Sequence, residues 1–212
     1  MTLPPSGSGL RLLAGALFAV LALSAARSSA PATETAIFSA GCYWTVEAVF
    51  EHVRGVTLVE AGITGRDVVM SAYQRNTTKT TGAAEAVRVS WDPRRVSYEE
   101  LLTVFFRAAH DPTSVNRQGP DVGSRYRSVL WVADDAQRRA ALEAIARIES
   151  SRAFPSPVAT QVATAGTFHL VPEDQQDFVE KNPTHPYVVT WDRPRIARFR
   201  TSLPALFREG AQ

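Results

Sequence analysis

The chain has 212 residues, 45% of them hydrophobic, and its 23 Lys and Arg against 21 Asp and Glu give a formal net charge of +2. This near-neutral balance argues against nucleic acid or an acidic lipid surface as the main partner. Once an N-terminal leader is set aside, about 180 residues remain, which is within the usual length of one domain with its own core.

The N-terminal segment, residues 1–30, is predicted to be a secretory signal peptide. Its apolar run Leu10–Ala26 contains no acid, is introduced by Arg11, and is followed by small residues. The stretch Leu12–Ala26 is shorter than the roughly 20 residues of a membrane-spanning helix, so a retained anchor is the second choice. No cysteine directly follows the run, which argues against a lipoprotein leader. We therefore expect an exported protein, located in the periplasm or outside the cell.

The first folded elements are predicted to be a strand, a turn and a helix. Thr35–Ser39 is a short apolar run that ends at Gly41. Apolar side chains then recur at positions i, i+3, i+4 and i+7, which is the spacing of one helix face. They are Val46, Val49, Phe50 and Val53. This pattern places Cys42 at the N-terminus of the helix.

Later segments continue the alternation of strands and helices. Ser97 and Glu100 have the spacing of a helix-capping box, and another helix is expected from Asp134 to about Ser150. Further strands are expected at Gly55–Glu60, Ala84–Trp91, Arg127–Ala133 and Val158–Ala163. The alternation predicts one α+β domain over residues 31–192, a two-layer sandwich with a mixed sheet and a ferredoxin-like core. Residues 193–212 are expected to form a charged, loosely specified C-terminal tail.

Cys42 is the one cysteine of the sequence. Unpaired backbone N–H groups and the positive end of the helix dipole favour a thiolate at a helix N-terminus. Gly41 before it allows a sharp turn and gives a reactant access. A buried structural cysteine is the alternative interpretation. The protein is expected to be exported and has no second cysteine for a disulfide. These two facts favour a reactive thiol over a structural one.

Glu85 is the second candidate for chemistry. In the strand Ala84–Trp91 it alternates with Val87, Val89 and Trp91, so its carboxyl group lies on the apolar face. The plain alternative is a glutamate at a strand end that bends out to water. If the side chain is instead desolvated, its pKa rises and it can hold a proton near neutral pH, as a general acid must. Cys42 and Glu85 would then be a nucleophile and its acid.

Five short segments together resemble the signature of one enzyme family. They are Gly41-Cys42-Tyr43-Trp44 followed by Glu47, Thr81-Gly82-Ala83-Ala84-Glu85-Ala86-Val87, His110-Asp111-Pro112, Asp121-Val122-Gly123-Ser124-Arg125-Tyr126-Arg127-Ser128, and Lys181-Asn182-Pro183. In kind and in order they are similar to segments of the peptide methionine sulfoxide reductase A family. The resemblance implies that residues 31–192 are a catalytic domain that reduces the S epimer of methionine sulfoxide, protein-bound or free, to methionine.

The resemblance also implies a role for individual residues. Cys42 would attack the sulfur of the sulfoxide, and Glu85 would protonate the sulfoxide oxygen. Tyr73 and Tyr126 would donate hydrogen bonds to that oxygen, and Asp121 would organise the site. A sulfoxide is a poor electrophile until its oxygen is protonated or hydrogen-bonded, so attack by a thiolate needs an acid and phenolic donors together.

Two aromatic residues beside the thiol complete the implied site. Tyr43 and Trp44 would form the wall of an apolar pocket for the S-methyl group, although each also reads as ordinary core packing. The products would be methionine and a Cys42 sulfenic acid. The resemblance implies no bound cofactor, and the absence of a second cysteine predicts an external thiol reductant, such as a thioredoxin-like protein or a small molecule. A monomer is expected.

Three positions depart from the family pattern. Ala83 stands where the family has a histidine, and Ile63 stands where it has the tyrosine of a Gly-Tyr-x-Gly segment. Asp174-Gln175-Gln176 replaces a Tyr-His-Gln run. These changes fall beside the proposed acid and at the expected rim of the site, whereas the proposed nucleophile, acid, phenols and aspartate are all present.

Two other functions compete with reduction. A cysteine hydrolase would also place cysteine at a helix N-terminus, with His185 as base and Asn182 close by, but the local cysteine signature of that class is absent. The other alternative is a non-catalytic binder of oxidised methionine, which would hold the ligand without thiol-dependent turnover. No metal site is expected, because the four histidines show no paired ligand spacing with Cys42.

Overall fold

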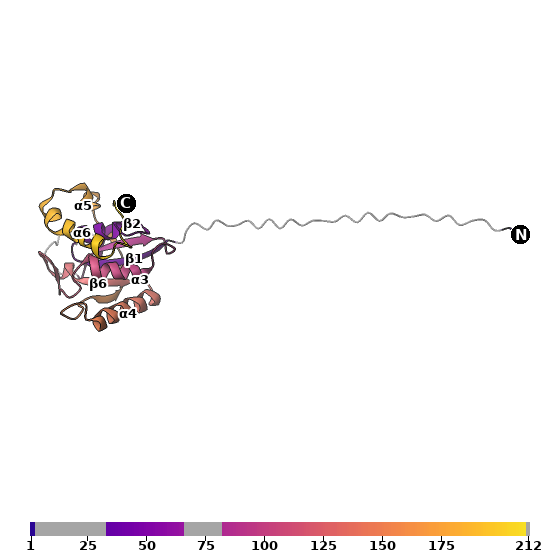
Figure 1. Ribbon diagram of the computed structural model, residues 1–212, viewed down its shortest axis with the longest axis horizontal. Helices are drawn as coiled ribbons and strands as arrows, with labels where there is room; N and C mark the ends of the chain where they lie inside the picture. The colour runs from indigo at the N-terminus through magenta and orange to yellow at the C-terminus, as the bar shows by residue number, and fades with distance from the viewer. Residues whose placement is uncertain (3–32, 66–81, 211–212) are drawn as a thin grey trace. The chain divides into compact units, whose positions relative to one another are not determined.

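The computed structural model describes residues 1–2, 33–65 and 82–210 (Figure 1). The strands are β1 (Glu34–Ala40), β2 (Val56–Thr64), β3 (Ala84–Trp91), β4 (Arg117–Gln118), β5 (Asp121–Val122), β6 (Ser128–Val132), β7 (Gln161–Thr164) and β8 (His169–Leu170). The α-helices are α1 (Tyr43–Glu51), α3 (Tyr98–Val104), α4 (Asp135–Ser151), α5 (Phe178–Lys181) and α6 (Arg193–Ser202). The π-helical and 3-10 turns are η1 (Phe105–Ala109), η2 (Ser124–Tyr126), η3 (Glu173–Gln175) and η4 (Val188–Asp192). All these elements belong to one compact unit, Pro31–Gln212.

Six strands form a mixed sheet in the order β7-β6-β1-β3-β2-β8. Neighbouring strands are antiparallel except β6 and β7, which run parallel. The central strands β6-β1-β3-β2, with α1 between β1 and β2 and α3 between β3 and β6, have the βαββαβ order of a ferredoxin-like core. The predicted α+β sandwich with a mixed sheet is confirmed.

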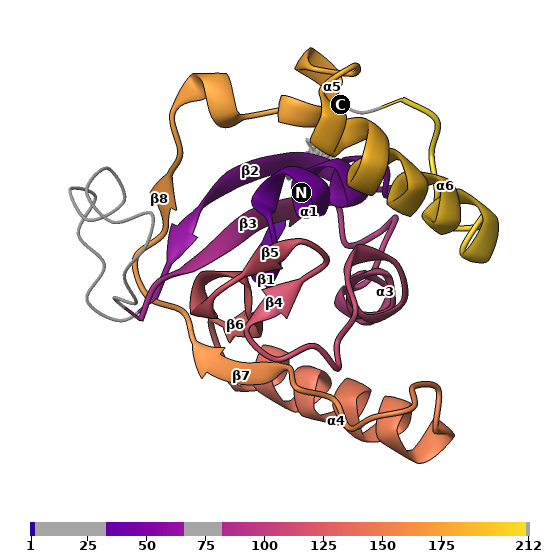
Figure 2. The same cartoon turned by 90° about the vertical axis from the view of Figure 1, so that its left-hand side faces the viewer.

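The helices pack on this sheet and on one another. Helix α1 contacts β2 and β3, and α4 contacts β6 and β7 at the other end of the sheet. Figure 2 shows α4 at one edge of the molecule and α5 and α6 at the opposite edge, with α1 and α3 between them. Because α6 contacts α1, the C-terminal part of the chain lies against the helix that follows Cys42.

Side-chain alternation along β3 decides which groups face the helices. Val87 and Trp91 are 0% exposed and belong to the main core, together with Phe38 and Phe50. The rings of Phe38 and Phe50 stack with centroids 4.7 Å apart, which joins β1 to α1. Glu85 shares the face of Val87, because residues two apart on a strand point the same way. The strand pattern therefore delivers a carboxyl group to the helical side of the sheet.

The C-terminal segment differs from the loosely specified tail that the sequence suggested. It contains α6, whose Phe199 is 0% exposed, and its ring meets that of Phe207 edge to face at 5.2 Å. Phe207 also forms a bridge to Val53, which lies just after α1. The prediction failed because α6 is rich in arginine, and Phe199 is its one buried residue, so no apolar periodicity is visible in the sequence.

The structure also tests several predictions about single elements. The capping box is confirmed, because Ser97 Oγ accepts from the backbone N–H of Glu100, and the Glu100 carboxylate accepts from the backbone N–H of Ser97. Strand β2 runs on to Thr64, beyond the predicted end at Glu60. The predicted signal peptide lies almost wholly outside the described residues. Among the helices of the described part of the chain, none is long and apolar enough to cross a membrane.

Candidate active site

A sharp turn between β1 and α1 presents Cys42. Gly41 has φ +103°, and a Cβ atom there would lie 2.7 Å from the side chain of Gln118, so the turn requires glycine. Cys42 is the N-cap residue of α1 and is partly exposed. The predicted strand, turn and helix are confirmed, with the thiol at the helix N-terminus.

Glu85 lies beside the first turn of that helix. Its Oε2 atom accepts a hydrogen bond from the backbone N–H of Tyr43 at 3.1 Å, and Tyr43 directly follows Cys42. Glu85 is only 4% exposed, which rules out a side chain that bends out to water. Burial raises the pKa of Glu85 to about 7. The carboxyl group can therefore hold a proton near neutral pH. It does so beside the backbone of Tyr43, the residue that follows Cys42.

Arg125 holds the other oxygen of this carboxylate. Its Nη2 atom lies 2.5 Å from Glu85 Oε1, and Arg125 reaches the site from the 3-10 turn η2. The positive charge lowers the pKa of Glu85, although the effect of burial is larger. Arg125 therefore sets the fraction of Glu85 that is protonated at a given pH.

The effect of the helix N-terminus on Cys42 is present but is outweighed. Burial raises the pKa of the Cys42 thiol most, the charge of Glu85 raises it further, and the backbone N–H of Trp44 opposes both by lowering it. Burial and Glu85 together therefore raise the pKa above the ordinary 9.0, against the direction expected from the helix N-terminus. Because Glu85 is one of the causes, protonation of its carboxylate makes loss of the Cys42 proton easier.

Tyr126 and Asp121 lie close enough to Cys42 and Glu85 for their charges to interact. Burial raises the pKa of Tyr126 to about 12, and the charge of Glu85 contributes to the rise, so the phenol keeps its proton and can donate it in a hydrogen bond. Asp121 accepts a short hydrogen bond from the hydroxyl group of Tyr187, and burial raises the pKa of this aspartate. A second phenol is thereby fixed at the site by a carboxylate.

A small hollow opens beside the thiol. Its wall includes Cys42, Gln118, Tyr187, Trp191 and Arg195. Burial raises the pKa of Tyr187 most, and the charge of Cys42 is the next cause, which puts this phenol next to the nucleophile. Trp191 is 43% exposed, so an apolar ring faces solvent beside the hollow.

Tyr43 and Trp44 take different positions. Tyr43 is 4% exposed and belongs to the main core, whereas Trp44 is partly buried and stacks on Phe178, with ring centroids 3.7 Å apart. Gln175 Oε1 accepts hydrogen bonds from Tyr43 Oη and Trp44 Nε1, both at 3.3 Å. Of the two aromatic residues, Trp44 presents the more accessible ring, and Gln175 holds both in place.

His110 has a structural role in this fold. Its Nδ1 lies 2.9 Å from the carbonyl oxygen of Phe105, which can only accept, so Nδ1 carries the proton. Its Nε2 then accepts from the Ser128 hydroxyl at 2.7 Å, and Ser128 Oγ lies 2.7 Å from Thr160 Oγ1. Burial lowers the pKa of His110 to about 3. The histidine therefore stays neutral and joins η1 to β6.

The residues proposed for a cysteine hydrolase do not form its geometry. His185 is exposed, and its ring packs edge to face against Trp44 and Phe178. The side chain of Asn182 donates to the carbonyl oxygen of Phe178, which closes α5. Within the described ranges no hydrogen bond joins His185 to Cys42, so the imidazole is not arranged as a base for this thiol.

The structure brings together most of the predicted site. The groups that meet around the Cys42 thiol are the side chains of Glu85, Tyr126 and Asp121 and the backbone N–H groups of Tyr43 and Trp44. Tyr73 lies outside the described residues. Sequence reasoning missed Arg125 and Tyr187 as contributors, and it placed Gln175 at the rim of the site without its bonds to Tyr43 and Trp44. Arg125 was detectable as the neighbour of Tyr126 in a signature segment, whereas nothing in the sequence ties Tyr187 to Asp121.

Comparison with known proteins shows which family this chain resembles. A family model described as "Peptide methionine sulfoxide reductase" matches residues 34–204. A peptide methionine sulfoxide reductase MsrA 2 of Mesorhizobium japonicum is 41% identical over 181 residues, which cover 85% of this chain and 93% of that protein. A peptide methionine sulfoxide reductase MsrA of Methanothermobacter thermautotrophicus is 46% identical over 150 residues, covering 71% of this chain and 88% of that protein.

Solved structures give the same result at the level of the fold. Mxr1 of Saccharomyces cerevisiae in its reduced form superposes with a TM-score of 0.66 at 26% identity, covering 72% of this chain and 87% of that one. Methionine sulfoxide reductase A of Corynebacterium diphtheriae has a TM-score of 0.62 at 28% identity, covering 74% of this chain and 78% of that one. The family model, the relatives and the solved structures therefore all identify the same family.

Proposed function

Because this chain belongs to the peptide methionine sulfoxide reductase A family, we propose that Cys42 is the thiol that attacks the sulfur of its substrate. The enzyme is a peptide-methionine (S)-S-oxide reductase, which converts the S epimer of methionine sulfoxide to methionine at the expense of a thiol. The observation that carries the role of Cys42 is the 3.1 Å hydrogen bond from Tyr43 N–H to Glu85 Oε2, since it holds an acid beside the thiol.

Glu85 is the proton donor in this proposal. The pKa of about 7 allows a protonated carboxyl group in the resting enzyme, and protonation removes one of the charges that keep Cys42 as a thiol. The reactive pair is then a Cys42 thiolate and a neutral Glu85. General acid catalysis of this kind typically contributes on the order of 10²–10⁴ in rate.

The oxygen of the sulfoxide is transferred to Cys42. The thiolate bonds to the substrate sulfur while Glu85 protonates the oxygen, and rearrangement releases methionine and leaves the oxygen on Cys42 as a sulfenic acid. The substrate sulfur gains two electrons and the cysteine sulfur loses two. Tyr126 and Tyr73 donate hydrogen bonds to the oxygen, Asp121 orients Tyr187, and Trp44 contacts the S-methyl group.

Return of Cys42 to the thiol requires an external reductant. Since the sequence has one cysteine, a thiol from a thioredoxin-like protein or a small molecule attacks the sulfenic sulfur and releases water. A second equivalent of thiol then resolves the mixed disulfide and regenerates Cys42. The repair of oxidised proteins is the biological role that this chemistry serves, and the enzyme acts as a monomer.

Residues 1–30 direct the enzyme out of the cytoplasm in this proposal. The apolar run without acids and the small residues after it support a cleaved signal peptide, which leaves the protein in the periplasm or outside the cell. N-terminal sequencing of the protein recovered from each cell fraction tests this. Recovery of an intact N-terminus from the cytoplasm would contradict it.

A single-turnover assay tests the reductase chemistry directly. The full chain is mixed with each epimer of a methionine sulfoxide peptide without reductant, and methionine is counted per Cys42. We expect about one equivalent from the S epimer, since one thiol can accept one oxygen, and none from Cys42→Ser. Methionine formation by Cys42→Ser would overturn the role of the cysteine. Tight binding of the S epimer without any methionine would favour the non-catalytic binder.

A further inference from the structure

Three carboxyl groups meet on the side of α1, away from the chemistry proposed above. This carboxyl cluster consists of Glu47, Glu51 and Asp177, whose potential ligand oxygens all lie within 4.8 Å of one another. Glu47 and Glu51 are four residues apart on α1, and hence share one face of that helix. Asp177 comes from a segment far along the chain and precedes α5. None of the three has a role in the mechanism proposed above.

One oxygen of the cluster is buried without a partner. Glu47 is 1% exposed. Its Oε2 accepts a hydrogen bond from the backbone N–H of Asp177 at 3.0 Å, whereas its Oε1 has no hydrogen-bond partner among the described residues. A buried carboxylate oxygen without a partner is costly, and such atoms are rare in folded proteins. Glu47 Oε1 can therefore accept one more hydrogen bond or bind a cation.

Two cations border the cluster. Lys181 Nζ lies 3.1 Å from Asp177 Oδ2, on the exposed side of the cluster, and 3.3 Å from Glu173. Arg208 donates through Nε and Nη2 to the backbone carbonyl oxygen of Glu51. Burial raises the pKa of Glu47 to about 8 and that of Glu51 to about 9. For both buried carboxyl groups, burial is thus the largest cause of the raised pKa, and the charge of Glu51 in turn acts on Arg208.

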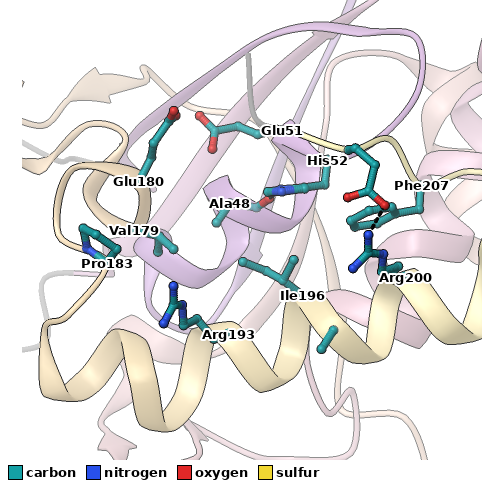
Figure 3. Close-up of a pocket in the computed structure, with 12 residues that line it drawn as sticks. Ala48, Glu51, His52, Val179, Glu180, Pro183, Arg193, Ile196, Arg200 and Phe207 are labelled. Atoms are coloured by element: carbon teal, nitrogen blue, oxygen red, sulfur yellow. Dashed lines mark hydrogen bonds and ion pairs between the residues drawn. The ribbon is translucent and has the colours of Figure 1, made fainter.

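The cluster borders a pocket at Glu51. Glu51 lies in the wall of a pocket between α1, α5 and α6, which also includes His52, Glu180, Arg193 and Ile196. Figure 3 shows the carboxyl groups of Glu51 and Glu180 facing each other at one end of this pocket. At the opposite end, Arg200 is paired with Glu209 and does not reach Glu51. The acidic end of the pocket therefore lies at the edge of the cluster.

We propose that the carboxyl cluster binds a calcium ion. All its donors are oxygens, which hard divalent cations prefer over soft ones. Two oxygens on opposite sides of one Ca²⁺ are about 5 Å apart, since each bond is about 2.4 Å. The separations of up to 4.8 Å fit that limit. Mg²⁺, with bonds of about 2.1 Å, would hold its ligands within about 4 Å and would require the cluster to contract.

The site would tie a segment of the active site to α1. Asp177 lies between Gln175, which accepts from Tyr43 and Trp44, and Phe178, which stacks on Trp44. An ion shared by α1 and Asp177 would therefore hold the Trp44 side of the reductase site in position. The competing arrangement is a proton shared between the carboxyl groups, which needs no metal.

Calcium binding by the full chain distinguishes these cases. After treatment with a chelator, the protein is titrated with CaCl₂ by calorimetry, and its thermal unfolding is followed with and without the ion. We expect binding of one Ca²⁺ per chain and a rise of several degrees in the unfolding midpoint. Glu51→Gln should bind at least about tenfold more weakly, because it removes a charged ligand while keeping the shape. Glu143→Gln, which removes an exposed acid on α4, should bind like the wild type.

Two results would overturn the proposal. One is a wild-type chain that binds no Ca²⁺ and whose midpoint does not respond to it, which would leave the shared proton as the explanation. The other is equal binding by the wild type and by Glu51→Gln. If Glu51→Gln does not fold, Asp177→Asn takes its place, since Asp177 is less buried. These readings do not depend on reductase activity, so they stand apart from the fate of the proposed function.

Discussion

Arg125 and Glu85 form an ion pair across 40 residues of sequence, with Arg125 Nη2 2.5 Å from Glu85 Oε1. Their side chains are 22% and 5% exposed, so the pair is shielded from water. Glu85 is subject to two opposing influences: burial favours the neutral acid, and Arg125 favours the carboxylate. The resulting pKa of about 7 is what a proton donor needs in order to work near neutral pH.

Removal of Arg125 should shift the pH dependence of reduction. In Arg125→Met the pKa of Glu85 should rise above about 7, because the opposing charge is gone and burial remains. The proton would then be retained to higher pH, and the alkaline limb of the single-turnover rate should move upward. Arg125→Lys keeps the charge and serves as the matched control. If the alkaline limb is unchanged in Arg125→Met, Glu85 is not the group whose titration sets that limb.

Replacement of the acid itself should abolish most activity. Glu85→Gln keeps the size of the side chain and an oxygen to accept from Tyr43 N–H, but it cannot donate the proton. We expect the single-turnover rate near neutral pH to fall by about 10²–10⁴-fold. Thiol titration of Cys42 and the circular dichroism spectrum should be retained, which shows that the site is intact. Full activity in this variant would remove Glu85 from the mechanism.

Gln175 should affect substrate binding more than the chemical step. Gln175→Ala removes the acceptor for Tyr43 Oη and Trp44 Nε1, both at 3.3 Å. A loss of about 1 kcal/mol corresponds to roughly a fivefold increase in KM for a sulfoxide peptide, with kcat little changed. Gln175→Glu keeps an oxygen acceptor and should restore most of the affinity. A fall in kcat with constant KM would contradict this role.

His110 should make the fold sensitive to acid. Its pKa is about 3 in the folded protein, against an ordinary 6.5, so below pH 6.5 the unfolded chain binds a proton that the folded chain does not. Its contribution to the free energy of unfolding is therefore present above pH 6.5. Below that pH the contribution decreases, and the slope approaches about 1.4 kcal/mol for each pH unit.

The measurement is urea unfolding from pH 7 to pH 5 in the wild type and in His110→Gln. The variant is expected to be less stable at pH 7, since it loses the bonds to Phe105 and Ser128. Its stability should nonetheless depend less on pH over this range. A parallel pH dependence in the two proteins would show that the histidine is not the titrating group.

Local patterns in the sequence determined much of this protein. Alternation in Ala84–Trp91 put Glu85 on the helical face, and the turn at Gly41 put Cys42 at a helix N-terminus, because both depend only on neighbouring residues. The signature segments then gave the family, and with it the sheet and the chemistry. The longer strands and helices before residue 152 follow the same local rules, whereas the short strands β4 and β5 were not predicted.

Only the tertiary structure decided the electrostatics of the site. Whether Cys42 is a thiol or a thiolate depends on burial and on Glu85, and the pairs Arg125–Glu85 and Tyr187–Asp121 join residues far apart in the chain. The arginine-rich α6 likewise becomes a helix of the core through Phe199 and its contact with Phe207. Such long-range contacts leave no periodic signal, because each rests on a few side chains that meet only after the chain has folded.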